Sequence, residues 1–343
     1  SWHSRRSECQ PECRESCGGR SKPAAYDRSV ETTSSAAIET RKLTKRYGRR
    51  GAIRALESLD LRVEGGELFG FLGPNGAGKS TTIRTLLGLL HPTSGSARVL
   101  GLDVVRDSVQ IRRRIGYLPS GFAVYDYMSG REYLDHMRSL GGRQATLRRR
   151  VADALELSEA VLRRPVRDYS RGMRQKIGIL QAMEGDPELL ILDEPSEGLD
   201  PLMQRSLHEL LLERSAAGRT IFFSSHLISE VERICNRVAI VRSGRLVALE
   251  TIESLVRLRR RRVEALVRDV PEKRMERIAA INGVSDLVTS RDSRGGHLLT
   301  CQVESAAVPE LIDRLRKLEI LDLLVEAGTL EEAFMSYYGE ASA

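Results

Sequence analysis

Four short apolar runs lie in the first three quarters of the chain, at Leu68–Leu72, Leu189–Leu192, Ile221–Phe223 and Val238–Val241. Apolar and polar positions do not alternate in these runs, so they lack the pattern of a strand with one face in water. Unbroken apolar runs of this length are typical of strands that are buried on both faces of a sheet. We therefore predict four buried strands.

Segments with helical spacing lie between these strands. Apolar residues three or four positions apart start after Lys79 and end before Pro92. A second helix is predicted to begin at Asp200, a residue type that caps helices, followed by Pro201, and to end at Gly218. Strands that alternate with helices predict an α/β domain with a largely parallel core sheet.

The strand pattern is absent between about residues 116 and 186. Residues 131–140, 145–162 and 172–184 have helical spacing instead. We interpret this stretch as a helical insertion, or helical subdomain, within the α/β domain.

A different pattern begins after Leu255. It predicts strands at Val263–Val267, Ser285–Ser290, His297–Val303 and Leu321–Val325, and helices at Glu272–Ile281 and Val308–Leu318. The order βαββαβ predicts a small α+β domain of the ferredoxin-like type. A last helix is expected at residues 329–339. The arginine run Arg257–Arg262 is interpreted as a solvated linker, with contact to anionic lipid as the alternative.

These patterns divide the chain into three parts: a disordered tail at residues 1–37, an α/β domain at 38–254 and an accessory domain at 255–343. Cys9, Cys13 and Cys17 lie four apart in the tail. Three thiols are one ligand short of a closed zinc site, so exposed thiols and metal binding both stay open. Cys235 and Cys301 are isolated along the chain.

The composition of the 343-residue chain is that of an ordinary soluble protein, with 41% hydrophobic and 29% charged residues. The net charge of +7 comes from an arginine-rich composition, and we expect no nucleic-acid partner from it. The sequence contains no apolar run of the roughly 18–20 residues that cross a bilayer, and no signal peptide. We therefore predict a cytoplasmic protein whose membrane role, if any, uses a separate chain.

A phosphate-binding loop, GPNGAGKST, lies between a predicted strand and a predicted helix. Its glycines let the backbone turn tightly and direct N–H groups toward a phosphate, and the helix N-terminus adds positive potential. Lys79 is expected to reach the β- and γ-phosphates of ATP, and the Ser80 hydroxyl to ligate Mg²⁺. The predicted ATP-binding residues are Gly73, Pro74, Asn75, Gly76, Ala77, Gly78, Lys79, Ser80 and Thr81.

Two carboxylates end the strand in LLILDEP. Asp193 is placed to hold Mg²⁺ through water, and Glu194 to orient an attacking water molecule. His226 follows another predicted strand, in TIFFSSHL. A histidine there could contact the γ-phosphate and help to position the water. Glu194 and His226 are therefore the predicted catalytic residues.

The motifs TKRYG, GPNGAGKST, YSRGMRQK, LLILDEP, SEGLD and SSH occur in this order. Together they resemble the ATP-binding subunit of ABC transporters, from about Ile38 to Leu255. The resemblance is specific because YSRGM lies one short helix before LLILDEP. Its variant signature is similar to that of single-domain ATPases of bacterial drug, antibiotic and sodium exporters.

The resemblance implies further site residues. Tyr47 would stack on adenine, and Ser170 and Gly172 would form a signature site for a γ-phosphate. Asp200 would end the loop that links two nucleotide sites. Ser120 stands where the family usually has the glutamine that links Mg²⁺ to the membrane partner, and it is retained as a candidate metal residue although serine is too short for the same reach.

The resemblance also implies a function. Two copies would close head to tail on two ATP molecules and drive a separate transmembrane permease, in the direction of export, from the inner face of the cell membrane. A soluble ABC ATPase that acts on ribosomes or DNA is the first alternative. A kinase with a phosphate loop is the second, and it leaves YSRGM and SEGLD unexplained.

Overall fold

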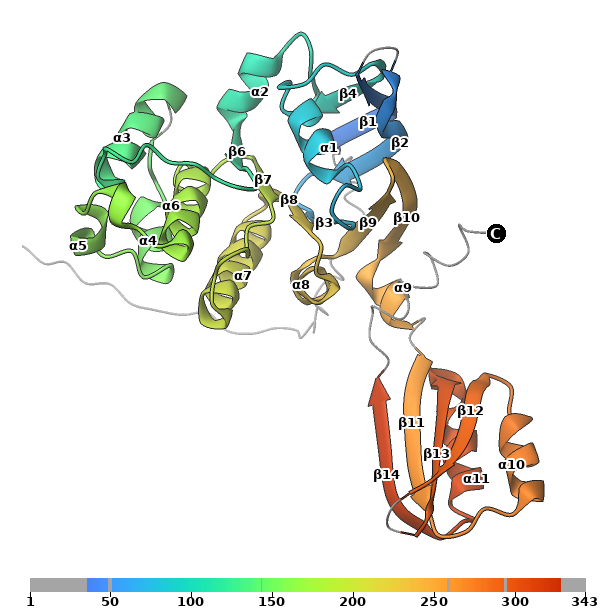
Figure 1. The fold of residues 1–343 in the computed structure, drawn as a ribbon. Coiled ribbons are helices and arrows are strands. Elements are labelled where there is room, and N and C mark those ends of the chain that lie inside the picture. Colours follow the sequence, from blue (N-terminus) through green and yellow to red (C-terminus); the bar gives the residue numbers. More distant parts are fainter. Residues whose placement is uncertain (1–35, 49–50, 143, 258–259, 293–294, 328–343) are drawn as a thin grey trace, which may run out of the picture. The chain divides into compact units, whose positions relative to one another are not determined.

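The computed structural model describes residues 36–48, 51–142, 144–257, 260–292 and 295–327 (Figure 1). Most of the predicted N-terminal tail, with Cys9, Cys13 and Cys17, lies outside these ranges, as does the predicted helix at 329–339. The first strand, β1, starts at Ala36, so the predicted end of the tail at residue 37 is two residues too late.

A six-stranded sheet forms the centre of the α/β domain (Figure 1), in the order β10-β9-β3-β8-β7-β6. All neighbours pair in parallel except β10 and β9, which are antiparallel. The four predicted strands are confirmed as four of its members. The strands are β3 Leu68–Leu72, β6 Ile115–Leu118, β7 Leu189–Asp193, β8 Thr220–Ser225, β9 Arg237–Arg242 and β10 Arg245–Thr251.

The edge strand β6 corrects the predicted start of the helical insertion at residue 116. It is only four residues long and contains Gly116, so its apolar pattern is too short to recognise. The glycine is required, because a Cβ there would collide with the carbonyl oxygen of Ala182. The helical subdomain therefore lies between β6 and β7. Its helices are α3 Gly130–Gly141, α4 Arg148–Ala154, α5 Glu159–Leu162 and α6 Arg171–Met183.

A second, antiparallel sheet with the order β2-β1-β4-β5 was not predicted from the sequence. Its strands are β1 Ala36–Tyr47, β2 Ile53–Glu64, β4 Ser94–Val99 and β5 Leu102–Asp103. Four register shifts interrupt the pairing of β1 with β2, which breaks the alternation that would mark such strands. One buried cluster joins this sheet to the central one through Ile38, Phe69 and Phe222.

The remaining helices of this domain are α1 Lys79–Leu86, α2 Ser108–Arg114, α7 Pro201–Ala216, α8 Ile228–Ile234 and α9 Ile252–Arg257. Helix α1 ends earlier than predicted, because Leu87 caps it and Gly88 has a left-handed backbone (φ 65°). Helix α7 begins as predicted: the Asp200 side chain accepts hydrogen bonds from the backbone N–H groups of Leu202 and Met203.

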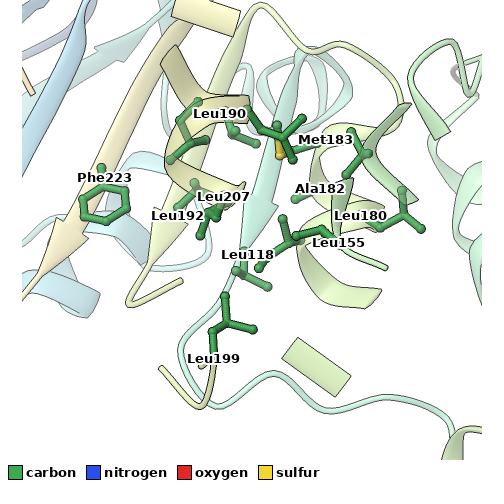
Figure 2. Close-up of a cluster of buried hydrophobic side chains, with 14 of the residues drawn as sticks. Leu118, Leu155, Leu180, Ala182, Met183, Leu190, Leu192, Leu199, Leu207 and Phe223 are labelled. Atoms are coloured by element: carbon green, nitrogen blue, oxygen red, sulfur yellow. The ribbon is translucent and has the colours of Figure 1, made fainter. Parts of the chain in front are cut away.

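The helical subdomain and the central sheet share one hydrophobic core (Figure 2). Leu180 and Met183 of α6 belong to the same buried cluster as Leu118 of β6 and Leu190 of β7. On the α7 side, Leu207 extends this cluster. Because burying an apolar side chain stabilises a fold by about 1.5–3 kcal/mol, this shared core holds α6 against the edge strand β6.

The C-terminal domain has the predicted order βαββαβ. Its sheet has the order β12-β13-β11-β14, with antiparallel neighbours throughout, and the two helices cover a separate core that includes Val263, Leu299 and Leu311. The elements are β11 Arg260–Val267, α10 Glu272–Ala279, β12 Val284–Arg291, β13 His297–Glu304, α11 Val308–Leu315 and β14 Ile320–Ala327.

The arginine run is not a simple linker, contrary to our prediction. Arg257 ends α9, and Arg260–Arg262 open β11. The side chains of Arg260–Arg262 are exposed, so the strand pattern is hidden in the sequence, whereas their backbone pairs with β13 and β14. None of the helices in the described ranges has both the length and the apolar character that a bilayer crossing requires.

His208 of α7 is a buried histidine whose ring packs edge-on against Phe223. Neither ring nitrogen has a hydrogen-bond partner among the described residues. Burial, with a smaller effect of Arg233, lowers the pKa of His208 from its ordinary value. The unfolded chain therefore takes up a proton at higher pH than the folded chain does.

We predict that this histidine weakens the fold in mild acid. The free energy of unfolding should fall as the pH drops below about 6.5, the ordinary pKa of histidine. Urea denaturation of His208→Leu between pH 7.5 and 5.5 should show a smaller loss than the wild type does. The exposed His91→Gln serves as control. An equal loss in His208→Leu and the wild type would contradict the prediction.

Candidate functional site

The loop Gly73–Gly78 connects β3 to α1 and can be formed only with glycine at both ends. A Cβ on Gly73 would collide with the carbonyl oxygen of Val241, and one on Gly78 would lie 2.7 Å from the carbonyl oxygen of Ala55. Gly78 also has a φ of 106°, which side chains rarely adopt. The loop therefore packs closely on its neighbours and leads directly into the N-terminus of α1.

Lys79 is the first residue of α1 and is only 6% exposed. Its Nζ donates a hydrogen bond to the Gly73 carbonyl oxygen at 2.6 Å and lies 3.1 Å from Glu194 Oε1. A buried ammonium group needs such partners, because an uncompensated charge is costly. The side chain is thus held across the loop with its charge near the pocket described next.

The loop forms one wall of a pocket of about 390 Å³, here named the phosphate pocket. The other walls come from β2, the segment after β6, and the segments that follow β7 and β8. The pocket is lined by Ile53, Arg54, Ala55, Pro74, Asn75, Gly76, Gly78, Lys79, Ser80, Thr81, Ser120, Glu194, Glu197 and His226. A glycine-rich loop, a helix N-terminus and a lysine at one pocket are suited to an anionic phosphate chain.

Glu194 follows β7 with a left-handed backbone (φ 54°), a conformation that costs a non-glycine residue about 1 kcal/mol or more. Its backbone N–H donates to the Ser224 carbonyl oxygen at 3.2 Å. Its side chain lies between Lys79 and His226, with 2.6 Å between Oε2 and His226 Nδ1. A carboxylate so held can accept a proton from a water molecule in the pocket.

Asp193 is 1% exposed, and its two oxygens differ in environment. Oδ1 accepts a hydrogen bond from Ser224 Oγ at 2.6 Å, whereas Oδ2 has no hydrogen-bond partner among the described residues. A buried carboxylate oxygen without a partner fits a site for a cation. Magnesium usually takes one or two protein ligands and completes its shell with water and phosphate oxygens, so Asp193 with Ser80 would suffice.

The structure brings most of the predicted site residues to one place. All predicted residues of the loop line the pocket except Gly73 and Ala77, and Ser120, Glu194 and His226 line it too. Asp193 is buried at the end of β7, directly before Glu194, and is not among the residues that line the pocket. Tyr47 does not line the pocket, although its strand neighbour Ile53 does. The centroid of the Tyr47 ring instead lies 5.2 Å from Lys45 Nζ.

The predicted signature residues do not line this pocket. Ser170 is the N-cap of α6, where its side chain accepts a hydrogen bond from the backbone N–H of Met173, and Gly172 lies in the first turn. Asp200 caps α7 and is also outside the pocket lining. The roles of these residues stay predictions.

Sequence reasoning missed several wall residues. Ile53, Arg54 and Ala55 belong to the unpredicted antiparallel sheet, so no motif pointed to them. Glu197 lies within the SEGLD motif, from which only Asp200 is predicted as a site residue, yet it lines the pocket. Ser224, which holds Asp193, could have been found only from its place at the end of a buried strand.

A model of the ABC transporter family matches residues 56–197. The Nod factor export ATP-binding protein I of Cupriavidus pinatubonensis is 34% identical over 307 residues, which are 89% of this chain and 91% of that protein. An ABC transporter ATP-binding protein of Nostoc sp. is 42% identical over 207 residues, which are 59% of this chain. The match spans 61% of that relative's length, less than two thirds.

A solved structure of an ATP-binding subunit of an ABC transporter has the same fold as the α/β domain. Its TM-score is 0.59 at 32% identity, and the match covers 64% of this chain and 92% of that one.

Lys79→Ala tests the pocket. Removing the ammonium group leaves the phosphates of a nucleotide without their cationic partner, so a fluorescent ATP analogue should bind at least about tenfold more weakly in an equilibrium titration. Lys273→Ala on α10 of the C-terminal domain is the control and should bind like the wild type. Unchanged affinity in Lys79→Ala would show that the analogue binds elsewhere.

Proposed function

The chain belongs to the ABC transporter family, and from this premise we propose that it binds and hydrolyses ATP and couples the hydrolysis to export through a separate membrane permease. The observation that carries the proposal is the convergence of Lys79, Glu194 and His226 on one pocket beside a phosphate-binding loop. The Nod factor export relative, which this chain matches over most of its length, supports the direction.

The hydrolysis step follows from the placement of these side chains. The loop N–H groups and Lys79 bind the phosphate chain and offset its negative charge. Glu194 accepts a proton from water as the water oxygen attacks the γ-phosphorus, the bond from that phosphorus to the bridging oxygen breaks, and ADP and phosphate are released. His226 holds Glu194 through its Nδ1. A Mg²⁺ ion held by Asp193 and Ser80 would supply positive charge beside the phosphates.

A second copy of the chain is part of the proposal. Ser170 and Gly172 lie at the N-terminus of a helix, where N–H groups favour an anion, yet they are outside the lining of the pocket formed by Lys79. In a head-to-tail dimer each chain would offer this helix start to the phosphate of the other. Tyr47 would then stack on adenine, and Asp200 would lie near the dimer contact.

The permease is proposed to bind at a second, larger pocket of about 830 Å³. The helical subdomain and the segment after β6 contribute to its walls, which include the exposed apolar residues Leu89, Tyr125 and Leu140. Exposed apolar surface in a concave site is typical of a protein contact. A ribosome or DNA partner is disfavoured, because such partners need a basic surface rather than an apolar cleft.

Ser120 lies between the two pockets. It lines the phosphate pocket, while its neighbours Pro119 and Gly121 line the larger one. We propose that this segment transmits the state of the nucleotide to the permease. The proposal places the protein in the cytoplasm, at the inner face of the cell membrane.

Glu194→Gln is the direct test of this function. The amide cannot accept a proton from water, so the rate of ATP hydrolysis should fall at least about a hundredfold while ATP binding is retained. With Mg²⁺ and ATP this variant should elute on size exclusion at twice the 38.3 kDa chain mass. Lys79→Ala should stay monomeric. Wild-type turnover by Glu194→Gln would remove Glu194 from the catalytic role.

Leu140→Arg tests the permease contact. Leu140 is 68% exposed on α3 and lines the larger pocket, so a charge there should reduce co-purification with the membrane protein encoded by the adjacent gene. ATP hydrolysis by the isolated chain should be unchanged. Leu212→Arg, at an exposed apolar position on α7 outside that pocket, is the matched control. Equal co-purification of both variants and the wild type would place the contact elsewhere.

A further inference from the structure

The turn of residues 194–200, here named the β7–α7 turn, packs against the start of α6. Gly198 has a left-handed backbone (φ 78°), and a Cβ on Gly172 would lie 2.8 Å from the Gly198 carbonyl oxygen. A Cβ on Gly198 would lie 3.4 Å from Arg171 Cγ. The backbone of the turn and the first turn of α6 are thus in close contact, with the aliphatic part of Arg171 beside Gly198.

Side chains of α6 hold this turn at its beginning and at its middle. Near its beginning, Gln175 Nε2 donates to the carbonyl oxygens of Pro195 at 2.9 Å and of Glu194 at 3.4 Å. Further along, Arg171 Nη2 donates to Glu197 Oε1 and forms an ion pair with it. The segment that carries the proposed catalytic carboxylate is therefore attached to α6 by side chains one helical turn apart.

The ion pair connects the lining of the phosphate pocket to the N-cap of α6. Glu197 lines the phosphate pocket together with Glu194, and Arg171 directly follows Ser170. The side chains of Arg171 and Glu197 are 75% and 47% exposed. An ion pair this exposed contributes little to the stability of a fold, so its effect is expected in the geometry of the turn.

We propose that Arg171 and Glu197 are a positioning pair that sets the β7–α7 turn, and with it Glu194, against the helix start that carries Ser170. Neither residue is a catalytic residue. The inference rests on the proposed function, because in the head-to-tail dimer Ser170 serves the partner's phosphate. The pair would then connect Glu194, which serves one ATP site, to Ser170 of the same chain, which serves the other ATP site.

A reversal of the two charges separates this role from direct contact with the nucleotide. If Arg171 acted on a phosphate itself, the double variant R171E/E197R would be as impaired as the single variants, because a glutamate would face the phosphate. If the pair positions the turn, the reversed pair restores it. Arg205 and Glu209 on α7 form a comparably exposed ion pair outside the pocket lining and supply the control R205Q/E209Q.

The experiment measures ATP hydrolysis and amide hydrogen exchange of residues 194–200. R171Q and E197Q should each lower kcat about fivefold, and the KM for ATP should stay within about twofold of the wild-type value. A fivefold change is of the size expected when two residues in contact are energetically coupled. Exchange in the turn should be faster in both. R171E/E197R should recover most of both properties, and R205Q/E209Q should match the wild type, as should the thermal midpoints of all variants.

Three results would overturn the positioning role: single variants with wild-type kcat and exchange, a reversed pair no better than the single variants, or an equal effect in the control pair. A wild-type chain that hydrolyses no ATP would instead contradict the proposed function. The exchange measurement needs no nucleotide, so it decides the positioning role in that case also.

Discussion

The parallel pairing of β3, β8 and β7 is the constraint on which the phosphate pocket depends. Leu72 pairs with Ser225, and Asp193 pairs with Ser224, so the three strands end at the same edge of the sheet. The residues that follow each strand, widely separated in sequence, therefore meet there. The buried cores on both sides of the sheet hold the strands in this register, because a shift of one residue would turn buried side chains toward the opposite face.

The same edge concentrates groups that are unfavourable for stability. Glu194 has a left-handed backbone, Asp193 has a buried oxygen without a partner among the described residues, and the Lys79 ammonium is buried. Each would cost free energy in an ordinary core. The surrounding sheet tolerates them because it buries a large apolar surface elsewhere. Such a cluster of unfavourable features is expected where a site is arranged in advance for a charged ligand.

The sequence predicts the chemistry of this site better than its walls. Motif spacing identifies Lys79, Asp193 and Glu194, because glycine turns and strand-end carboxylates have local physical causes. The walls come from long-range pairing. Ile53 reaches the pocket through an antiparallel sheet whose register shifts hide it in the sequence, and β6 is too short to show a pattern. Hydrogen-bond partners that lie far apart in sequence, such as Ser224 and Asp193, are not marked by any motif.

The segment around Ser120 lines both pockets, so the proposed coupling would not need a long side chain at this position. Ser120 faces the phosphate pocket, while Pro119 and Gly121 line the larger cleft. Since neighbouring residues of this segment line different pockets, a displacement of its backbone would change both pockets at once. A glutamine at this position would add a direct side-chain contact, but the backbone path does not require it. A serine at position 120 is therefore compatible with coupling of the two pockets through the backbone of this segment.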